Sequence, residues 1–144
     1  MDREKGVFKK NATLYYDNKI IRGDSLYFES EKDYAAATKN VSIVDSLNNS
    51  VITGHYGEIF KERDSAIITR RALAVNIVDQ DSLFIHADTL VATGPEERRI
   101  LRAYYDVRIL KSDLRGRSDS LYLDESIGLT KLLNKPLTTQ QEQI

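Results

Sequence analysis

The chain has 144 residues, with 21 lysines and arginines against 22 aspartates and glutamates, and it contains no cysteine. The absence of cysteine excludes disulfides, thiolate metal sites and cysteine nucleophiles. The charges are balanced and scattered, which predicts a mixed solvated surface and gives no reason to expect a nucleic-acid partner. A chain of this length forms one domain that buries roughly two thirds of the surface its unfolded form exposes.

The residues show no targeting pattern. No apolar run approaches the roughly 18 residues that a transmembrane helix needs. The first residues, MDREKGVFKKN, lack the apolar region of a signal peptide. We therefore expect either a cytosolic protein or a segment of a longer secreted chain.

Short strands are predicted along the whole chain, and their sequences recur. The first, KNATL at residues 10–14, resembles a later one, KNVSI at 39–43. A second pattern appears in order as GDSLYF at 23–28, a degenerate YGEIFK at 56–61, ADTLVA at 87–92 and SDSLYL at 118–123. The anchor residues of these copies recur every 31–33 residues, which indicates a repeat. The anchors are Asp24, Gly57, Asp88 and Asp119.

A further strand is predicted between anchors, reading NVSI at 40–43, AVNI at 74–77 and DVRI at 106–109. Leu73, Val75 and Ile77 alternate with less apolar neighbours, and residues 101–109 alternate in the same way. This period of two places one face of each strand on a core. Because the chain opens in the middle of a repeat, we expect a segment of a longer array or an array with a truncated first copy.

The segment after Gly94 has two interpretations. Residues 94–97 resemble a helix start, so a helix from Pro95 is an alternative. The alternation and the β-branched residues favour a turn at 94–98 followed by a strand. Residues 138–144 lack any pattern and are predicted to form a disordered tail.

These elements predict a single all-β domain over residues 1–137. Each copy is too small to bury its apolar face alone, so neighbouring copies must complete the core. Turns rich in Asn, Asp and Gly separate the strands and tolerate the left-handed backbone of tight hairpins. The expected architecture is a solenoid-like stack of antiparallel strands.

Two short strings near residue 24 match known motifs, and the repeat argues against both. GDSL names a family of serine esterases whose base lies in an Asp-x-x-His element, but neither histidine here has an aspartate three residues before it. Ser25 is matched in frame by Glu58, Thr89 and Ser120, so its position varies as a strand position would. The integrin-binding string RGD, at 22–24, is placed at the start of a strand and not at a loop tip. We expect no enzyme.

A column of basic or potentially basic side chains stands two residues before the anchors. Its members are Arg22, His55, His86 and Arg117. Residues two apart share a strand face, so these side chains can pair with the anchor aspartates. The column is interpreted either as exposed charge pairs of low energy or as a weak anion-binding site. A metal site is not expected, because the two histidines lie in different copies without a ligand spacing.

Two adjacent apolar columns run through the anchor strands. One contains Leu26, Ile59, Leu90 and Leu121, and the next contains Tyr27, Phe60, Val91 and Tyr122. Adjacent residues point to opposite faces of a sheet, so one core covers only one column unless a bulge or a partner intervenes. We place the Leu26 column inside, and an error of one residue would place the Tyr27 column there instead.

The ordered set of strands resembles a known family. The matching pieces are RGDSLYF at 22–28, ATKNVSI at 37–43, HADTL at 86–90 and LRGRSDSLYLD at 114–124. Over about residues 12–133 they resemble the OstA-like or LptA-like domain of lipopolysaccharide transport. The resemblance implies a repeat-built, open β jelly roll whose two sheets form a V, with an apolar interior that holds lipopolysaccharide acyl chains. It also implies a periplasmic or outer-membrane-associated location, and end-to-end strand pairing with other domains of this type or with copies of itself.

The leading prediction is a non-enzymatic lipid-handling module that helps to bridge transport to the outer membrane. It takes lipopolysaccharide or a similar lipid as its ligand, and it needs no cofactor. The predicted lining consists of the apolar residues assigned to the interior face. They are Leu26, Phe28, Val41, Ile43, Ile59, Val75, Ile77, Leu90, Val107, Ile109 and Leu121.

Two other classes of protein remain open. One is a β-solenoid scaffold or adhesin-like interaction module, with a filled core and a purely structural role. The other is a polysaccharide-cleaving β-helix enzyme, which needs clustered carboxylates on one face. Asp24, Asp88 and Asp119 offer such a column, but each has a basic residue two positions earlier.

Overall fold

Antiparallel strands make up almost all of the described chain, which comprises residues 7–16, 18–47, 49–78, 80–95, 98–124, 129–133 and 137–138 of a computed structural model. The strands are β1 (Val7–Lys10), β2 (Thr13–Tyr16), β3 (Lys19–Arg22), β4 (Ser25–Glu29), β5 (Tyr34–Asp45), β6 (Ser50–Phe60), β7 (Ser65–Val78), β8 (Asp81–Thr93), β9 (Ile100–Lys111), β10 (Leu114–Asp124), β11 (Leu129–Leu133) and β12 (Leu137–Thr138). Two 3-10 turns, η2 (Ser30–Lys32) and η3 (Lys61–Arg63), follow β4 and β6. The strand interpretation after residue 94 is confirmed by β9.

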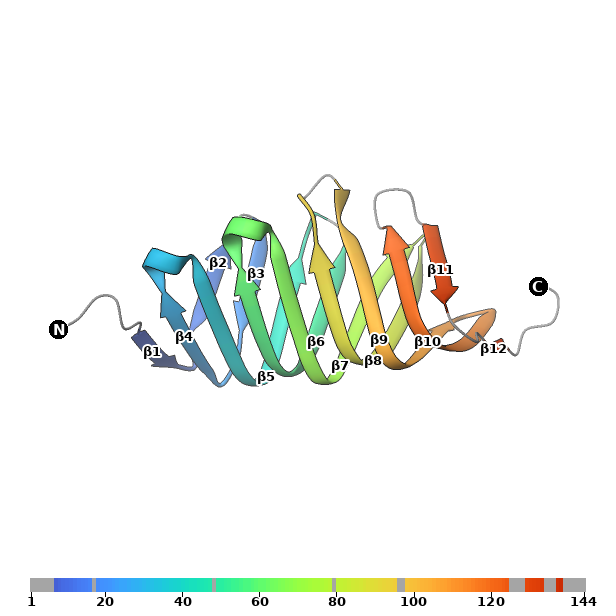
Figure 1. Ribbon diagram of the computed structural model, residues 1–144, viewed down its shortest axis with the longest axis horizontal. Helices are drawn as coiled ribbons and strands as arrows, with labels where there is room; N and C mark the ends of the chain where they lie inside the picture. The colour runs from blue at the N-terminus through green and yellow to red at the C-terminus, as the bar shows by residue number, and fades with distance from the viewer. Residues whose placement is uncertain are drawn as a thin grey trace.

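One sheet contains all the strands, in the order β1-β4-β5-β6-β7-β8-β9-β10-β11, with β3 also beside β5, β2 beside β3 and β12 beside β10. Each long strand from β5 to β10 therefore passes through two layers, as Figure 1 shows at the lower edge of the view. We call these two layers wall 1 and wall 2. Wall 1 contains β1, β4, β11, the first halves of β5, β7 and β9, and the second halves of β6, β8 and β10. Wall 2 contains β2, β3, β12 and the other halves. The predicted all-β fold, an open jelly roll in the shape of a V, is confirmed.

The strands turn from one wall to the other at pairs of residues with left-handed backbone. These pairs, the corner pairs, are Lys39-Asn40 in β5, Arg70-Arg71 in β7 and Tyr105-Asp106 in β9, with φ between 53° and 71°. In the neighbouring strand each pair lies opposite a single residue, so each corner is a β-bulge that bends the sheet. The opposing residues are His55, Asp88 and Asp119 respectively.

Asp24 occupies the equivalent place at the first corner. Its backbone N–H donates to the carbonyl of Lys39 at 2.8 Å, and the side-chain amide of Asn40 donates to its carboxylate at 3.1 Å. The corner residues are therefore Asp24, His55, Asp88 and Asp119. The choice of Gly57 as the second anchor was wrong by two residues, because the register makes His55 the counterpart of the three aspartates.

Gly57 instead holds the inward position that leucine holds in the other copies. It is buried in a row across wall 1 that alternates large and small side chains. The row is Leu26, Ala37, Gly57, Ile68, Leu90, Ala103 and Leu121. A Cβ at Gly57 would lie 2.7 Å from Cδ1 of Ile68, so the isoleucine fills the space that the missing side chain leaves.

In the second half of β7, the residues that face the interior are not the predicted ones but those that alternate with them. Ala74 and Asn76 are 0% and 3% exposed, whereas Ile77 is 50% exposed. Val75 and Ile77 therefore lie on the outer face of wall 2, because alternate residues of a strand share a face. Alanine in the inward position hid the true phase from a search for large apolar residues.

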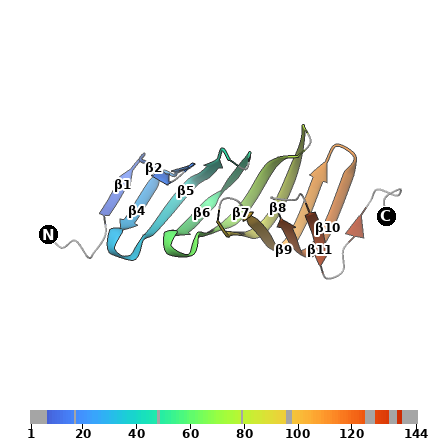
Figure 2. The ribbon, with the colours of Figure 1, turned by 90° about the horizontal axis from the view of Figure 1, so that it is seen from above.

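The two ends of the stack are formed by different strands. β1 and β2 lie at one end, and β11 and β12 lie at the other, as Figures 1 and 2 show. Thr138, the first residue of the predicted tail, ends β12, and residues 139–144 lie outside the described residues.

The corner pairs can be tested at Arg71, whose φ is 62°. We expect Arg71→Val to lower the free energy of unfolding in urea by about 1–2 kcal/mol, because a branched side chain is strained in this region. Arg71→Gly should leave it unchanged or slightly higher, and Arg22→Val, at an exposed strand position, should change it by less than about 0.5 kcal/mol. Equal losses in the valine and glycine variants of Arg71 would contradict the assignment.

The position of Gly57 can be tested by compensation. We expect Gly57→Leu alone to destabilise the fold by about 1–3 kcal/mol, because the added atoms collide with Ile68. Combining it with Ile68→Ala should recover at least half of that loss in thermal or urea unfolding. Additive losses in the double variant would show that the two residues do not share one space.

Candidate lipid-binding groove

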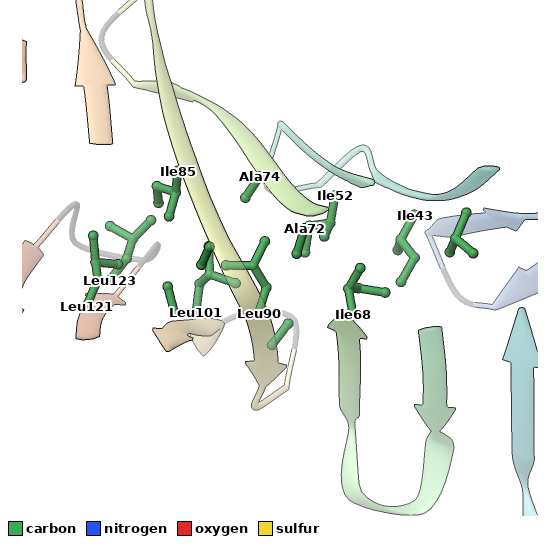
Figure 3. Close-up of a cluster of buried hydrophobic side chains, with 14 of the residues drawn as sticks. Ile43, Ile52, Ile68, Ala72, Ala74, Ile85, Leu90, Leu101, Leu121 and Leu123 are labelled. Carbon is green, nitrogen blue, oxygen red and sulfur yellow. The ribbon is translucent and has the colours of Figure 1, made fainter. Parts of the chain in front are cut away.

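The space between the walls is lined by rows of apolar side chains that run along the stack. In wall 2 one such row is Ile21, Ile43, Ile52, Ala74, Ile85 and Ile109. Wall 1 supplies the row through Leu26 and a second row through Ile59 and Leu101. Figure 3 shows side chains of this cluster from both walls lying between them. The interior is thus continuous and apolar along the described stack.

Nine of the eleven predicted lining residues face this interior. Leu26, Val41, Ile43, Ile59, Leu90, Val107, Ile109 and Leu121 are buried, and Phe28 packs against the cluster while partly exposed. Val75 and Ile77 do not line it. The Tyr27 column lies on the outer face, so the inward choice of the Leu26 column agrees with the burial.

Several interior residues were not predicted from the sequence. Ile21, Ile52 and Ile85 each stand three residues before a corner residue and are 1%, 7% and 0% exposed. With His55 in place of Gly57 as the second anchor, these three isoleucines occupy the same position in their repeat copies. Ile68, Leu101 and Leu123 were also missed, and each is at most 2% exposed.

The interior is filled by its own side chains. The buried apolar residues are 0–9% exposed, and two cavities between the walls have volumes of only about 30 and 20 Å³. Such cavities have room for one or two water molecules and not for an acyl chain. An acyl chain could enter only if the walls moved apart or the interior side chains rearranged.

Polar residues line the mouth, which is the side of the V opposite the corners. Lys19, Asp45, Ser50 and Asn76 form an inward-facing row at the free edge of wall 2, each no more than 8% exposed. Buried polar and charged groups are costly unless they are paired or hydrogen-bonded. The cleft between the walls is therefore apolar in its interior and polar at its rim.

Polar contacts cross the mouth and join the walls. Nε of Arg99 in wall 1 lies 3.9 Å from Oδ2 of Asp45 in wall 2, and both residues are 5% exposed. Near β2, the hydroxyl of Tyr16 donates to Oδ1 of Asp64 at 2.7 Å, and Nζ of Lys61 lies 5.0 Å from the centre of the Tyr16 ring. We call these interactions the mouth contacts. They hold the free edges of the walls together.

The predicted basic column is partly assembled, and it lies outside the groove. Arg22, His86 and Arg117 share one row on the outer face of wall 2, where Arg108 lies between the last two. His55 lies apart from them at a corner.

Among the described residues no group of three or more His, Cys, Asp or Glu side chains could hold a metal ion. Nor does the described part of the chain include a helix long and apolar enough to span a membrane.

The outer face of wall 1 carries an aromatic cluster of Tyr27, Tyr34 and Phe60, with ring centres 5.3–6.4 Å apart. Tyr34 donates a hydrogen bond to Glu58. Burial and this carboxylate raise the pKa of the Tyr34 hydroxyl, so it stays protonated and acts as a donor. Ala36, the register partner of Tyr27 on the same face, is only 9% exposed.

The bent, one-sheet V with left-handed corners defines an LptA-like β jelly roll. A solved structure with this fold is LptH from Pseudomonas aeruginosa, described as the LptA homologous periplasmic component of the conserved lipopolysaccharide transport device. The two superpose with a TM-score of 0.75 over 85% of this chain and 94% of LptH, at 9% sequence identity. At this identity the likeness is one of fold. No family model and no curated protein matches the sequence.

The mouth contacts predict a measurable coupling between Arg99 and Asp45. We expect Arg99→Met to lower the free energy of unfolding by about 2–4 kcal/mol, because the buried carboxylate of Asp45 then keeps its hydrogen bond from Asn18 but loses its ion pair. The double variant Arg99→Met with Asp45→Asn should recover at least half of this loss. As a control, Arg108→Met removes an exposed pair with Asp106 and should cost less than about 1 kcal/mol. Equal losses for the two arginines would argue against a buried contact across the mouth.

Proposed function

We propose that this chain is a non-enzymatic, periplasmic lipid-handling module that binds acyl chains of lipopolysaccharide, or of a similar lipid, between its walls. The observation that carries the proposal is the continuous apolar interior, which runs along the stack and meets a polar rim at the mouth. An amphiphile matches this arrangement, with its acyl chains in the depth and its head group at Lys19 and Arg99. Each methylene group that leaves water contributes about 0.8 kcal/mol. The fold shared with LptH supports the same class of ligand.

Binding by this route requires the mouth to open. The corner pairs join the walls along one edge, so separation of the free edges would break the mouth contacts and the apolar packing. Acyl chains would then replace the packing that the walls lose. The charges of Lys19, Asp45 and Arg99 would meet the head group and water at the opened rim.

Strand edges at both ends of the stack support a place in a longer bridge toward the outer membrane. Among the described strands, β1 and β2 end one side and β11 and β12 end the other. An open strand edge is a template for another strand, supplied by a related domain or by a second copy. End-to-end pairing would continue the interior from one unit into the next.

A crosslink across the mouth tests the proposal, and the absence of native cysteine makes it specific. Tyr16→Cys and Asp64→Cys, whose native side chains meet across the mouth, should hold the walls together when joined by a short bismaleimide. We expect the uncrosslinked variant to bind lipopolysaccharide in native mass spectrometry. Added lipopolysaccharide should also displace a fluorescent acyl probe from it. The crosslinked variant should bind lipopolysaccharide at least tenfold more weakly. Ser65→Cys with Thr93→Cys, a directly opposed pair within wall 1, should keep full binding after crosslinking.

The complete packing of the interior favours a second candidate, a structural module with a filled core. In that case neither protein would bind lipopolysaccharide or the acyl probe, although both would be folded. Equal binding before and after the mouth crosslink would instead reject the mouth as the route for lipid.

A further inference from the structure

The outer face of wall 2 carries an apolar stripe that contributes nothing to the interior. The strand register places its members side by side across neighbouring strands from β2 to β9. They are Tyr15, Ile20, Val44, Val51, Val75, Phe84 and Leu110. Tyr15, Phe84 and Leu110 are 69%, 39% and 46% exposed. Val75, which sequence analysis had assigned to the interior, belongs to this stripe.

Basic side chains gather where the stripe reaches β8, β9 and β10. Arg115 follows Leu110 in the same row, and His86, Arg108 and Arg117 lie together in the next outward-facing row. Arg108 pairs with Asp106 at 3.6 Å. Within the described part of the chain, no acidic side chain forms an ion pair with His86, Arg115 or Arg117. The cluster therefore has a positive excess at neutral pH.

The two features meet in a hollow of about 570 Å³. Its wall consists of the outer-face residues Phe84, His86, Arg108, Leu110, Arg115 and Arg117, with Ile109 and Gly116 between the two rows. Ile109 and Gly116 are register partners whose inner sides face the core, so their backbone forms the floor. Apolar carbon makes up most of the lining, although three arginines and a histidine contribute to it.

We infer that this hollow binds a single anionic amphiphile, with its phosphate or carboxylate head at Arg115, Arg117 and His86. Guanidinium groups form strong, charge-assisted hydrogen bonds with such heads. The aliphatic chain would lie on Phe84 and continue along the stripe, which extends about 14 Å from Leu110 to Val51 at about 4.8 Å per strand. A hydrophilic anion would leave the apolar floor unused. A flat bilayer would not enter a concave surface.

This site lies on the opposite face of wall 2 from the interior and does not depend on the proposed function. The side chains of Phe84 and Ile85 point to opposite faces, and Ile85 is fully buried. Occupation of the hollow therefore does not require the mouth to open. The protein with its mouth crosslinked should retain the outer site.

The absence of tryptophan allows a local probe, because Phe84→Trp places a single indole in the hollow. Monomeric lysophosphatidic acid, below its micellar concentration, should shift the tryptophan emission to the blue with a saturable dependence on concentration. Lysophosphatidylcholine with the same chain should bind at least fivefold more weakly, and inorganic phosphate should cause no shift, because binding needs both head and chain. Equal affinity for the two lysolipids would overturn the proposal.

Paired variants in the Phe84→Trp background separate the hollow from general charge. Arg115→Asn with Arg117→Asn should weaken lysophosphatidic acid binding by roughly tenfold. Arg70→Asn with Arg71→Asn removes the same charge at a corner, where asparagine tolerates the left-handed backbone, and should change the affinity less than twofold. Arg115→Lys with Arg117→Lys keeps the charge and should bind better than the asparagine pair. An emission shift with anionic vesicles but none with the monomer would identify a membrane-docking face and reject the single-amphiphile site.

Discussion

Backbone strain at the corner pairs determines the shape of this protein. Lysine, arginine and tyrosine occupy the left-handed region there, where each residue costs roughly 1–2 kcal/mol relative to the right-handed conformation. The strain is maintained because each pair is a bulge against one residue of the next strand, and the rows on both sides are fully paired. Since every long strand bends at the same level, the two walls stay continuous and their apolar faces meet.

The rows between the walls divide the interior by depth. Close to the corners, alanine and glycine alternate with leucine and isoleucine, which lets opposite side chains interdigitate at the density expected of a core. At the free edges the inward residues become Lys19, Asp45 and Asn76, and Arg99 reaches them from the other wall. The same bend thus produces a well-packed hinge side and a polar, more separable side. Wall 2 also has an apolar stripe on its outer face, which lies beside a row of basic and polar side chains.

The period, the all-β class and most of the interior could be predicted from sequence because apolar residues alternate along most strands. Leu26, Leu90 and Leu121 each follow a corner aspartate by two positions, and that spacing defines the inward phase. The anchor of the second copy was misplaced because Gly57 has no side chain and because His55 stands where the other copies have an aspartate. Matching by residue type therefore selected Gly57 in place of His55. Val75 and Ile77 misled for a different reason: the larger apolar residues of that strand face outward, and Ala72 and Ala74 face the core. Contacts across the mouth, such as Arg99 with Asp45, join residues distant in sequence and have no local pattern.

The corner residues, at positions 24, 55, 88 and 119, also limit how such a chain can change its length. An insertion or deletion inside a strand would move one bulge out of line with its neighbours and reverse the faces of everything beyond it. The hairpin connections at the free edges bear no such restriction, and the 31- and 33-residue intervals between corners show that copies of unequal length are tolerated. Growth by whole two-strand units leaves the cross-section unchanged. Duplication of such units is therefore the simplest genetic route by which a protein of this kind could be made longer or shorter to fit the distance it must cover.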